Sequence, residues 1–351
     1  KIKMKIYFFI IKALKYFFKI DFSFLKNEKI LVYSALPSRE LNQIIKYKYQ
    51  VMKIPSIKLN IFILIKMILN LKLRKIDYLY FFIKKINPKI LISTYDNDIH
   101  IFKLKKKFPN LKFILIQNGK RGGVYDIFNN EFKKPIKEKN FIDYFFVFGN
   151  AIKKEYQKFV SSKFYTIGSL RNNFFKIKNN VLNKKKIVLI SQFRPKYSMN
   201  FKYKNKLINY ENYYKNSTNL FQILEKFCFE NKIQLLILPS STNNSSDWVK
   251  EKSFFNDISI FKKFKFLKKK TNLDSYKIIN KYDIFFGEDS TLIYEALSKN
   301  KRIGSFSRMK NIDLYSFTWP LKNNKKGFFF SNNLNDYELR RIYRNITNIN
   351  Q

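Results

Sequence analysis

A short turn near the end of the chain combines the residue types that bind phosphate and ribose. The stretch GEDST, Gly287–Thr291, follows an apolar run and precedes a helical segment that contains Glu295. Ser290 or Asp289 can cap that helix, and its free backbone N–H groups and dipole favour a phosphate. Glu295 lies one turn further, on the same face as Thr291, where a carboxylate can accept from two ribose hydroxyls. The turn predicts a nucleotide site; a capped helix with a surface charge is the alternative.

A second turn, QNGKRGG at Gln117–Gly123, follows the apolar run LKFILI and holds three of the eight glycines in the chain. Glycine permits positive φ and close approach of the backbone to a ligand, while lysine and arginine attract anions. The spacing is not that of a Walker loop, because the Lys-Ser/Thr pair is absent. The turn predicts phosphate or acceptor binding, or else a loop that needs only flexible turns. Its candidate residues are Asn118, Gly119, Lys120 and Arg121.

Two further turns each join an arginine to a hydroxyl or an amide. They are IGSLRNN, at residues 167–173, and SQFRP, at residues 191–195. Arginine suits bidentate recognition of phosphate or carboxylate. We assign Arg171 and Asn172 to the acceptor or a phosphate, and Ser191 and Arg194 to a nucleotide donor. Solvent-facing loops without a ligand are the alternative at both places.

The elements that carry these turns alternate between short apolar strands and helices, which predicts parallel sheets covered on both faces. Strands are expected at Lys29–Leu36, Lys89–Tyr95, Leu111–Gln117, Tyr144–Phe148, Lys163–Ile167, Lys186–Ser191, Ile233–Leu238, Lys263–Leu267, Ile284–Phe286 and Arg302–Phe306. Helices are expected at Ile57–Leu71, Lys75–Ile86, Asn97–Phe108, Ala151–Val160, Leu220–Asn231, Asp247–Phe255, Leu273–Asn280, Thr291–Ser298 and Asn335–Ile346. The predicted fold is α/β, with two tandem Rossmann-like domains and an inter-domain cleft at the carboxyl ends of the strands.

The length of 351 residues favours two domains, and a polar, charged stretch divides the two halves. We predict an N-terminal domain at 1–178, a linker at 179–186, and a C-terminal domain at 187–351 with a helical tail. The first twenty residues predict a basic amphipathic helix that lies in a membrane interface, or an ordinary helix packed on its domain. No stretch is long and apolar enough to span a bilayer.

The formal net charge of +45 has two interpretations. It either favours a polyanionic partner or reflects a composition rich in Lys, Asn, Ile, Phe and Tyr, with an anionic membrane surface as a possible contact. The lysines are spread along the chain and no nucleic-acid motif occurs, so we predict no nucleic-acid partner; a basic nucleic-acid binder remains the alternative of a different class. Cys228 is the only cysteine, which excludes an intramolecular disulfide and fits a reducing cytoplasm.

Four segments resemble a known family: ILIQNGKR, DYFFVFGNAIKKEY, IGSLRNN and GEDSTLIYEALSKNKRIGSFS. They are similar to bacterial surface carbohydrate biosynthesis proteins, which are distantly similar to capsule glycosyltransferases and to CDP-glycerol glycerophosphotransferases. The resemblance spans roughly Lys89–Ser307 and implies the GT-B arrangement. In that arrangement the N-terminal domain, 1–178, is the acceptor side, and the C-terminal domain, 187–351, holds the nucleotide-activated donor. It implies that Ser290 and Thr291 contact the donor phosphates and that Glu295 contacts the ribose. Ile293 departs from the family, which commonly has glycine there.

Asp96-Asn97-Asp98, after the run KILISTY, is the candidate for acid–base chemistry. The spacing matches the Asp-x-Asp metal motif of the other large glycosyltransferase fold. Two tandem α/β domains instead favour a metal-independent site, in which cations and helix dipoles stabilise the leaving phosphate. We therefore predict no metal and no cofactor, with Asp96 or Asp98 as the general base or as helix caps. His100, the only histidine, is interpreted as structural, with a catalytic role as the alternative.

The resemblance, taken with these patterns, implies a glycosyltransferase of surface polysaccharide or lipid-linked glycan synthesis at the cytoplasmic membrane face. A nucleotide-activated sugar is the donor, and a hydroxyl of the growing glycan or of a lipid-linked acceptor attacks its anomeric carbon. Lys120, Arg121, Arg194 and the helix at Ser290 would stabilise the departing phosphate. A polyol-phosphate transferase and a nucleotide-sugar epimerase are the alternatives among enzymes.

Overall fold

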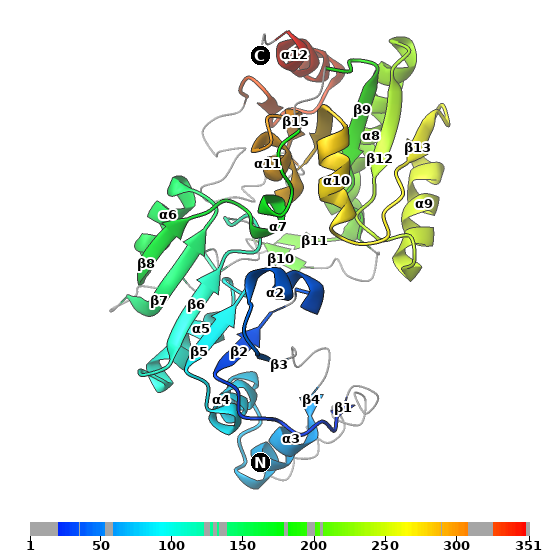
Figure 1. Cartoon of the computed structure of the whole chain (residues 1–351). Coiled ribbons are helices and arrows are strands. Elements are labelled where there is room, and N and C mark those ends of the chain that lie inside the picture. The colour runs from blue at the N-terminus through cyan, green and yellow to red at the C-terminus, as the bar shows by residue number, and fades with distance from the viewer. Residues whose placement is uncertain are drawn as a thin grey trace. The chain divides into compact units, whose positions relative to one another are not determined.

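The structure is a computed structural model of the whole chain (Figure 1). It describes residues 20–34, 36–52, 59–122, 127–128, 132, 139–178, 182–194, 201–203, 206–288, 290–307 and 326–348. The chain forms two compact units, the first made of Lys1–Asn118 with Glu131–Leu170 and the second of Gly119–Asn130 with Arg171–Gln351. The described residues begin at Ile20, the first residue of strand β1 (Ile20–Asp21), so the amphipathic helix predicted for residues 1–20 lies outside them apart from Ile20 itself.

The first unit is built on a six-stranded parallel sheet with the order β3-β2-β5-β6-β7-β8. The strands are β2 (Ile30–Tyr33), β3 (Gln50–Met52), β5 (Ile90–Ser93), β6 (Lys112–Ile116), β7 (Asn140–Val147) and β8 (Val160–Thr166). Strand β1 forms a separate parallel pair with β4 (Leu59–Asn60). The helices are α2 (Ser38–Ile44), α3 (Ile61–Leu69), α4 (Lys75–Ile86), α5 (Ile99–Lys107) and α6 (Asn150–Gln157).

Local sequence signals fix several of these helices. Asn60 caps α3 by accepting from the backbone N–H groups of Phe62 and Ile63. Helix α4 begins where the Asp77 carboxylate accepts from the backbone N–H of Arg74, and it ends at Asn87 in the left-handed conformation. Caps of this kind set the residues at which these helices begin and end.

The second unit holds another six-stranded parallel sheet, with the order β13-β12-β9-β14-β15-β16. Its strands are β9 (Lys186–Ile190), β12 (Gln234–Leu238), β13 (Phe264–Phe266), β14 (Ile284–Gly287), β15 (Arg302–Phe306) and β16 (Phe330–Ser331). Its helices are α7 (Leu170–Asn173), which begins at the last residue of the first unit, α8 (Tyr210–Glu230), α9 (Ser246–Ile258), α10 (Asp274–Lys281), α11 (Thr291–Leu297) and α12 (Asp336–Thr347). An antiparallel pair, β10 (Phe201–Tyr203) and β11 (Lys206–Ile208), precedes α8.

Helices cover both faces of the second sheet. Along β9, Ile187 and Leu189 pack into one core cluster with side chains of α8, α9 and α12. Val188 and Ile190 point the other way, into a cluster with side chains of α10 and α11. Since successive residues of a strand point to opposite faces, the near-continuous apolar runs match a sheet that is buried on both sides. The predicted fold class, α/β with two Rossmann-like parallel sheets, is confirmed, and the inter-domain cleft stays a prediction.

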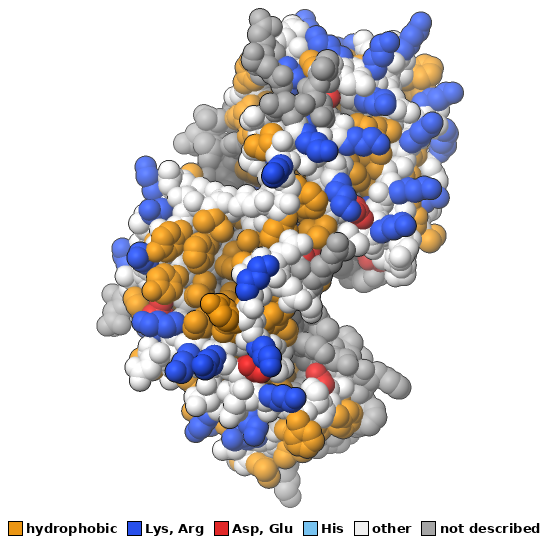
Figure 2. All heavy atoms as spheres, viewed as in Figure 1, with side chains coloured by type: hydrophobic (Ala, Val, Ile, Leu, Met, Phe, Trp, Pro, Cys, Tyr) orange, Lys and Arg blue, Asp and Glu red, His pale blue; other side chains and the backbone are white. Residues whose placement is uncertain are grey.

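The two compact units differ from the predicted domains in two segments. Residues 119–130 and 171–178 belong to the second unit, although the first domain was predicted to run to residue 178. Figure 2 shows that lysine and arginine side chains are spread over the face in view of each unit, without one dominant patch. Apolar side chains gather in the same view over β7 and β8, where Phe141 and Tyr165 are exposed.

Candidate functional site

The order of the second sheet creates a switch point between β9 and β14. In chain order its strands read 3-2-1-4-5-6, so the chain builds outward from β9 on one side and then resumes on the other side with β14. Ligands of open α/β sheets bind outside the carboxyl ends of the strands at such a point. The residues that follow these two strands are Ser191–Arg194 and Glu288–Thr291. The predicted donor residues Ser191, Arg194, Ser290 and Thr291 therefore lie at this edge.

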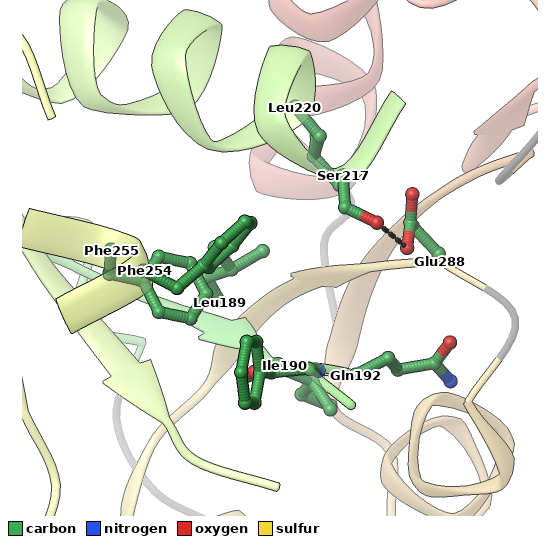
Figure 3. A pocket seen from close by; sticks show the side chains of 10 residues that line it. Leu189, Ile190, Gln192, Ser217, Leu220, Phe254, Phe255 and Glu288 are labelled. Atoms are coloured by element: carbon green, nitrogen blue, oxygen red, sulfur yellow. Dashed lines mark hydrogen bonds between the residues drawn. The ribbon is translucent and has the colours of Figure 1, made fainter. Parts of the chain in front are cut away.

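A small pocket of about 20 Å³ lies at the same edge (Figure 3), with room for one or two water molecules. Residues of β9, α8, α9 and the β14 end line it. Ser217 of α8 donates to the Glu288 carboxylate at 2.7 Å, and Glu288 is buried. This bond directs the carboxylate toward α8. Asp289, the other carboxyl group of the turn, lies outside the described residues.

The start of α11 is joined to the glycine-rich turn. Ser290 caps the helix by accepting from the backbone N–H of Leu292 at 3.2 Å. Thr291 Oγ1 accepts from the backbone N–H of Lys120 at 3.1 Å. A Cβ on Gly119 would lie 3.4 Å from the same Thr291 oxygen, which shows how closely this backbone approaches the helix. The structure thus brings residues 119–120 of one predicted set together with Ser290 and Thr291 of the other.

Two cationic side chains accompany this turn. The Lys120 ammonium lies 5.6 Å from the centre of the Tyr294 ring, within cation–π range. The Arg121 guanidinium donates to the carbonyl oxygen of Lys120 at 2.9 Å, and the side chain is buried. Both positive charges therefore lie with α11 in the second unit. Asn118 is exposed and belongs to the first unit.

The far end of α11 involves three more predicted residues. Asn172 is buried and donates through Nδ2 to the Glu295 carbonyl oxygen at 3.1 Å and to Ser298 Oγ at 2.8 Å. The Glu295 side chain is also buried, and its Oε1 accepts from the Tyr276 hydroxyl at 3.1 Å. Glu295 is therefore not an ordinary surface charge. Arg171 is half-buried beside Asn172.

Ile293, the residue that departs from the family pattern, points into the core. It is fully buried, and a Cβ on Gly287 would lie 3.1 Å from its Cδ1 atom. The glycine at the end of β14 therefore leaves room for the isoleucine of α11. The space that a glycine at position 293 would leave open is filled here by the Ile293 side chain.

The sequence did not reveal a carboxylate that joins the loop after β9 to the loop after the neighbouring strand β12. Glu251 of α9 is fully buried and accepts from Ser191 Oγ at 2.5 Å. It also accepts from the backbone N–H groups of Ser240 at 2.9 Å and Ser241 at 3.0 Å. The Ser191 hydroxyl therefore serves to fix its loop. One signal was present: Glu251 precedes the buried Phe255 by one helical turn, which places it on the core face.

Lys269 is a second buried charge that the sequence did not reveal. Its ammonium donates to the carbonyl oxygens of Pro239 and Ser240, each at 2.8 Å. Burial lowers the pKa of Lys269 to about 8, with the charge of Arg194 acting in the same direction and Glu251 opposing it. Arg194 itself is exposed, and its NH1 donates to the Phe193 carbonyl oxygen at 2.8 Å.

The first sheet has its own switch point, between β2 and β5, because its chain order reads 2-1-3-4-5-6. Ser34 and Thr94, just after these strands, share a hydrogen bond of 2.7 Å. Asp96 is fully buried: Oδ1 accepts from the backbone N–H of Asn118 at 3.2 Å, and Oδ2 accepts from the Tyr156 hydroxyl at 2.7 Å. Asp96 therefore ties the ends of β5 and β6 to α6.

Asp98 caps α5 and collects several donors. Its Oδ1 accepts from the backbone N–H of His100 at 3.1 Å and lies 2.7 Å from His100 Nδ1. Its Oδ2 lies 2.7 Å from Lys75 Nζ and 3.2 Å from the Tyr33 hydroxyl. Burial alone would raise the pKa of Asp98, but the hydrogen bonds and charge from Lys75 and the bonds from His100 outweigh it and lower the pKa.

Comparison with known proteins identifies the chain. Residues 114–351 match a family described as "putative O-antigen biosynthesis protein". The chain belongs to this family. The match includes the glycine-rich turn, both arginine turns and the whole of the second sheet. A search of curated proteins gives no match.

One solved structure shares the fold of this O-antigen biosynthesis family member, and a second shows a weaker likeness to it. A UDP-GlcNAc 2-epimerase of Methanocaldococcus jannaschii, solved with UDP-GlcNAc and UDP, is 12% identical at a TM-score of 0.50 and covers 92% of this chain and 93% of its own. A glycosyltransferase of Rickettsia africae is 14% identical at a TM-score of 0.44 and covers 93% of this chain and 94% of its own. At 12% identity, the likeness to the epimerase shows the fold alone.

The described residues contain neither a membrane-spanning helix nor a metal-binding cluster. No described helix is long and apolar enough to cross a membrane. Within the same part of the chain, no group of three or more His, Cys, Asp or Glu side chains is placed to hold a metal ion.

Proposed function

We propose that this chain is a glycosyltransferase that moves a sugar from a nucleotide-activated donor to a growing surface polysaccharide or lipid-linked glycan. One observation carries the proposal: the β9–β14 switch point of the second sheet gathers Ser290, Thr291 and the cationic turn at Lys120–Arg121 around the start of α11. Such an edge suits a nucleotide diphosphate. The epimerase with the same fold is solved with UDP-GlcNAc and UDP, so UDP-linked sugars are the first donors to test.

The proposed donor site divides its work among the residues described. Ser290, Thr291 and the cations Lys120, Arg121 and Arg194 bind the diphosphate and stabilise it as it leaves, without a metal ion. Glu295 accepts from the ribose hydroxyls. In the structure its Oε1 accepts from the Tyr276 hydroxyl, and a ribose hydroxyl would take the place of this donor. Ser191 contributes by fixing its loop through Glu251.

The acceptor is proposed to bind the first unit, with Asn118 and the Asp96–His100 turn near its reacting hydroxyl. In the second unit, Arg171 and Asn172 support the donor-side helix α11.

We propose that the enzyme acts in the cytoplasm at the inner face of an anionic membrane. Exposed apolar side chains of α3, such as Phe62, Ile65 and Leu69, with Lys66 among them, support contact with such a surface. The spread of basic side chains in Figure 2 gives no support to a nucleic-acid partner.

A thermal-shift screen against UDP-, GDP-, CDP- and CMP-linked sugars tests the donor site. A ligand that binds only the folded protein raises its unfolding temperature, and the stabilisation grows with the logarithm of the ratio of ligand concentration to Kd. Replacing Thr291 with valine should weaken the bound donor about 10- to 100-fold, since hydrogen bonds to a charged group contribute about 1.5–3 kcal/mol. Thr291→Ser should retain binding, because the hydroxyl remains.

Two results would contradict the proposal: no nucleotide sugar stabilises the protein, or Thr291→Val binds the donor as the unaltered protein does. Ser253→Ala, on the exposed face of α9, is the matched control for loss of a hydroxyl. Donors labelled separately in the sugar and the phosphate show which group moves. Transfer of the phosphate label to the acceptor would indicate a polyol-phosphate transferase. Conversion of the donor in the absence of an acceptor would indicate an epimerase.

A further inference from the structure

The only histidine of the chain is held by a carboxylate at the switch point of the first sheet. His100 Nδ1 lies 2.7 Å from Asp98 Oδ1, and the same oxygen accepts from the His100 backbone N–H at 3.1 Å. Asp98 is the cap of α5, so the ring is fixed at the first turn of a helix that follows β5. A carboxylate oxygen can only accept, so it places the proton of the neutral imidazole on Nδ1.

The opposite ring nitrogen is then left with a lone pair. Among the described residues, none makes a hydrogen bond to His100 Nε2, and 29% of the side chain is exposed, compared with 11% for Asp98. A general base must be reachable by the hydroxyl whose proton it takes. His100 meets this requirement at the edge where the first sheet would bind a ligand.

The two aspartates first predicted as bases are poorly placed for that task. Asp96 is fully buried, and each of its carboxylate oxygens already accepts a hydrogen bond. Asp98 accepts from Lys75, Tyr33 and His100. Its lowered pKa makes it a weak base near neutral pH. A histidine, by contrast, is the side chain that most often acts as a general base.

The charged and titratable groups around the pair come from four elements. Lys75 belongs to α4, Tyr33 to β2, and Tyr95 to the turn after β5, while Asp98 and His100 begin α5. The rings of Tyr33 and Tyr95 lie 4.7 Å apart, and burial raises the pKa of Tyr95 to about 12. Both tyrosines therefore stay neutral near neutral pH, and Asp98 and Lys75 are the charges that the imidazole senses.

We propose that His100 is the general base of the transfer and that Asp98 is its positioning residue; this rests on the glycosyl transfer proposed above. The acceptor O–H bond breaks and its proton moves to His100 Nε2. The acceptor oxygen forms a bond to the anomeric carbon, and the bond from that carbon to the diphosphate oxygen breaks. The nucleoside diphosphate leaves with the electron pair. Asp98 stabilises the resulting imidazolium, and a single displacement of this kind inverts the anomeric centre.

Nitrogen NMR of the full chain labelled with ¹⁵N-histidine tests the geometry directly, because one histidine gives one pair of ring signals. At pH 8 we expect the proton on Nδ1 and none on Nε2, and a mixture of the two forms in Asp98→Asn, which keeps the helix cap. A proton fixed on Nε2 in the unaltered protein would overturn the proposal.

Turnover tests the chemical role. Nucleotide release is measured with each UDP-, GDP-, CDP- and CMP-linked sugar and a bacterial glycolipid extract as acceptor. We expect His100→Gln to lower kcat about 10²- to 10⁴-fold while the donor-induced thermal shift is unchanged. Lys103→Gln, an exposed change on the same helix, should leave both unchanged. Asp98→Asn should also lower kcat, because the imidazole loses the carboxylate that fixes its Nδ1 proton and stabilises the imidazolium.

The outcomes separate this inference from the proposed function. If the unaltered protein transfers sugar and His100→Gln does so equally well, His100 is not the base although the enzyme is a glycosyltransferase. If the unaltered protein neither binds nor turns over any donor, the proposed function fails and the role of His100 fails with it. A loss of turnover in His100→Gln together with intact donor binding supports the dyad.

Discussion

Replacing Glu251 with alanine should destabilise the second unit more than any change on its surface. Glu251 is fully buried and accepts from a hydroxyl of Ser191 and from the backbone N–H groups of Ser240 and Ser241. Alanine would leave these donors without their acceptor. It would also remove one of the two negative charges that act on Lys269, leaving that of Asp274.

The expected loss follows from the number and kind of these bonds. Breaking a buried charged network by removing one partner costs about 3–5 kcal/mol. At a denaturant slope of about 2 kcal/mol per molar urea, the unfolding midpoint of the unit should fall by about 1.5–2.5 M. Glu251→Gln should cost less, because one amide oxygen can still accept.

Urea titration followed by fluorescence of Trp248 measures this loss. Trp248 lies on the same helix, with its ring 5.1 Å from that of Phe266, and a Trp319→Phe background makes it the only reporter. Asp257→Ala is the matched control, since this carboxylate is on α9 and exposed. A loss below about 1 kcal/mol, or an equal loss in the control, would show that Glu251 does not hold these loops.

Two further predictions concern the second unit. The pKa of Lys269 is about 8 in the folded protein and 10.5 ordinarily. Between these two pH values the unfolded chain therefore binds more protons than the folded chain, so the free energy of unfolding rises with pH. Urea titrations from about pH 8 to 10 should show this rise, relative to Lys269→Met, at up to about 1.4 kcal/mol per pH unit. Gly304→Ala should lower the free energy of unfolding by about 1–3 kcal/mol in calorimetry, because the new Cβ overlaps the Phe286 ring. Gly149→Ala is the control and should cost less than about 1 kcal/mol, because nothing lies within 4 Å of its new Cβ. Equal losses in the two variants would refute the packing argument.

The strands and helices of the sheets could be predicted because their signals are local. The helix expected at Lys75–Ile86 has these bounds in the structure, and the strand expected at Lys29–Leu36 forms at Ile30–Tyr33. Strand β3 (Gln50–Met52) was missed, because three residues at a sheet edge show no period. Helix α8 begins ten residues before the predicted Leu220, where polar residues conceal the apolar repeat.

The site could be predicted in part. The turns after strands could be placed at the carboxyl edges of the two sheets, because parallel strands align their carboxyl ends, while their roles in binding stay predictions. The partners that decide each side chain's role lie far apart in sequence: Thr291 accepts from Lys120, 171 positions away, and Ser191 donates to Glu251, 60 positions away. Pairings of this kind depend on the sheet order, which no local pattern contains. For the same reason, the buried Asp96 and the half-buried Asp98 could not be told apart.

The glycine-rich turn has a consequence for engineering. Its residues from Gly119 belong to the second unit, although the strand before it belongs to the first. A chimera that exchanges Arg171–Gln351 between two relatives would therefore join a foreign Thr291 to the recipient's own Lys120. An exchange of modules should therefore change donor preference only when residues 119–130 are transplanted as well. Natural recombination among relatives would likewise have to keep the two segments together.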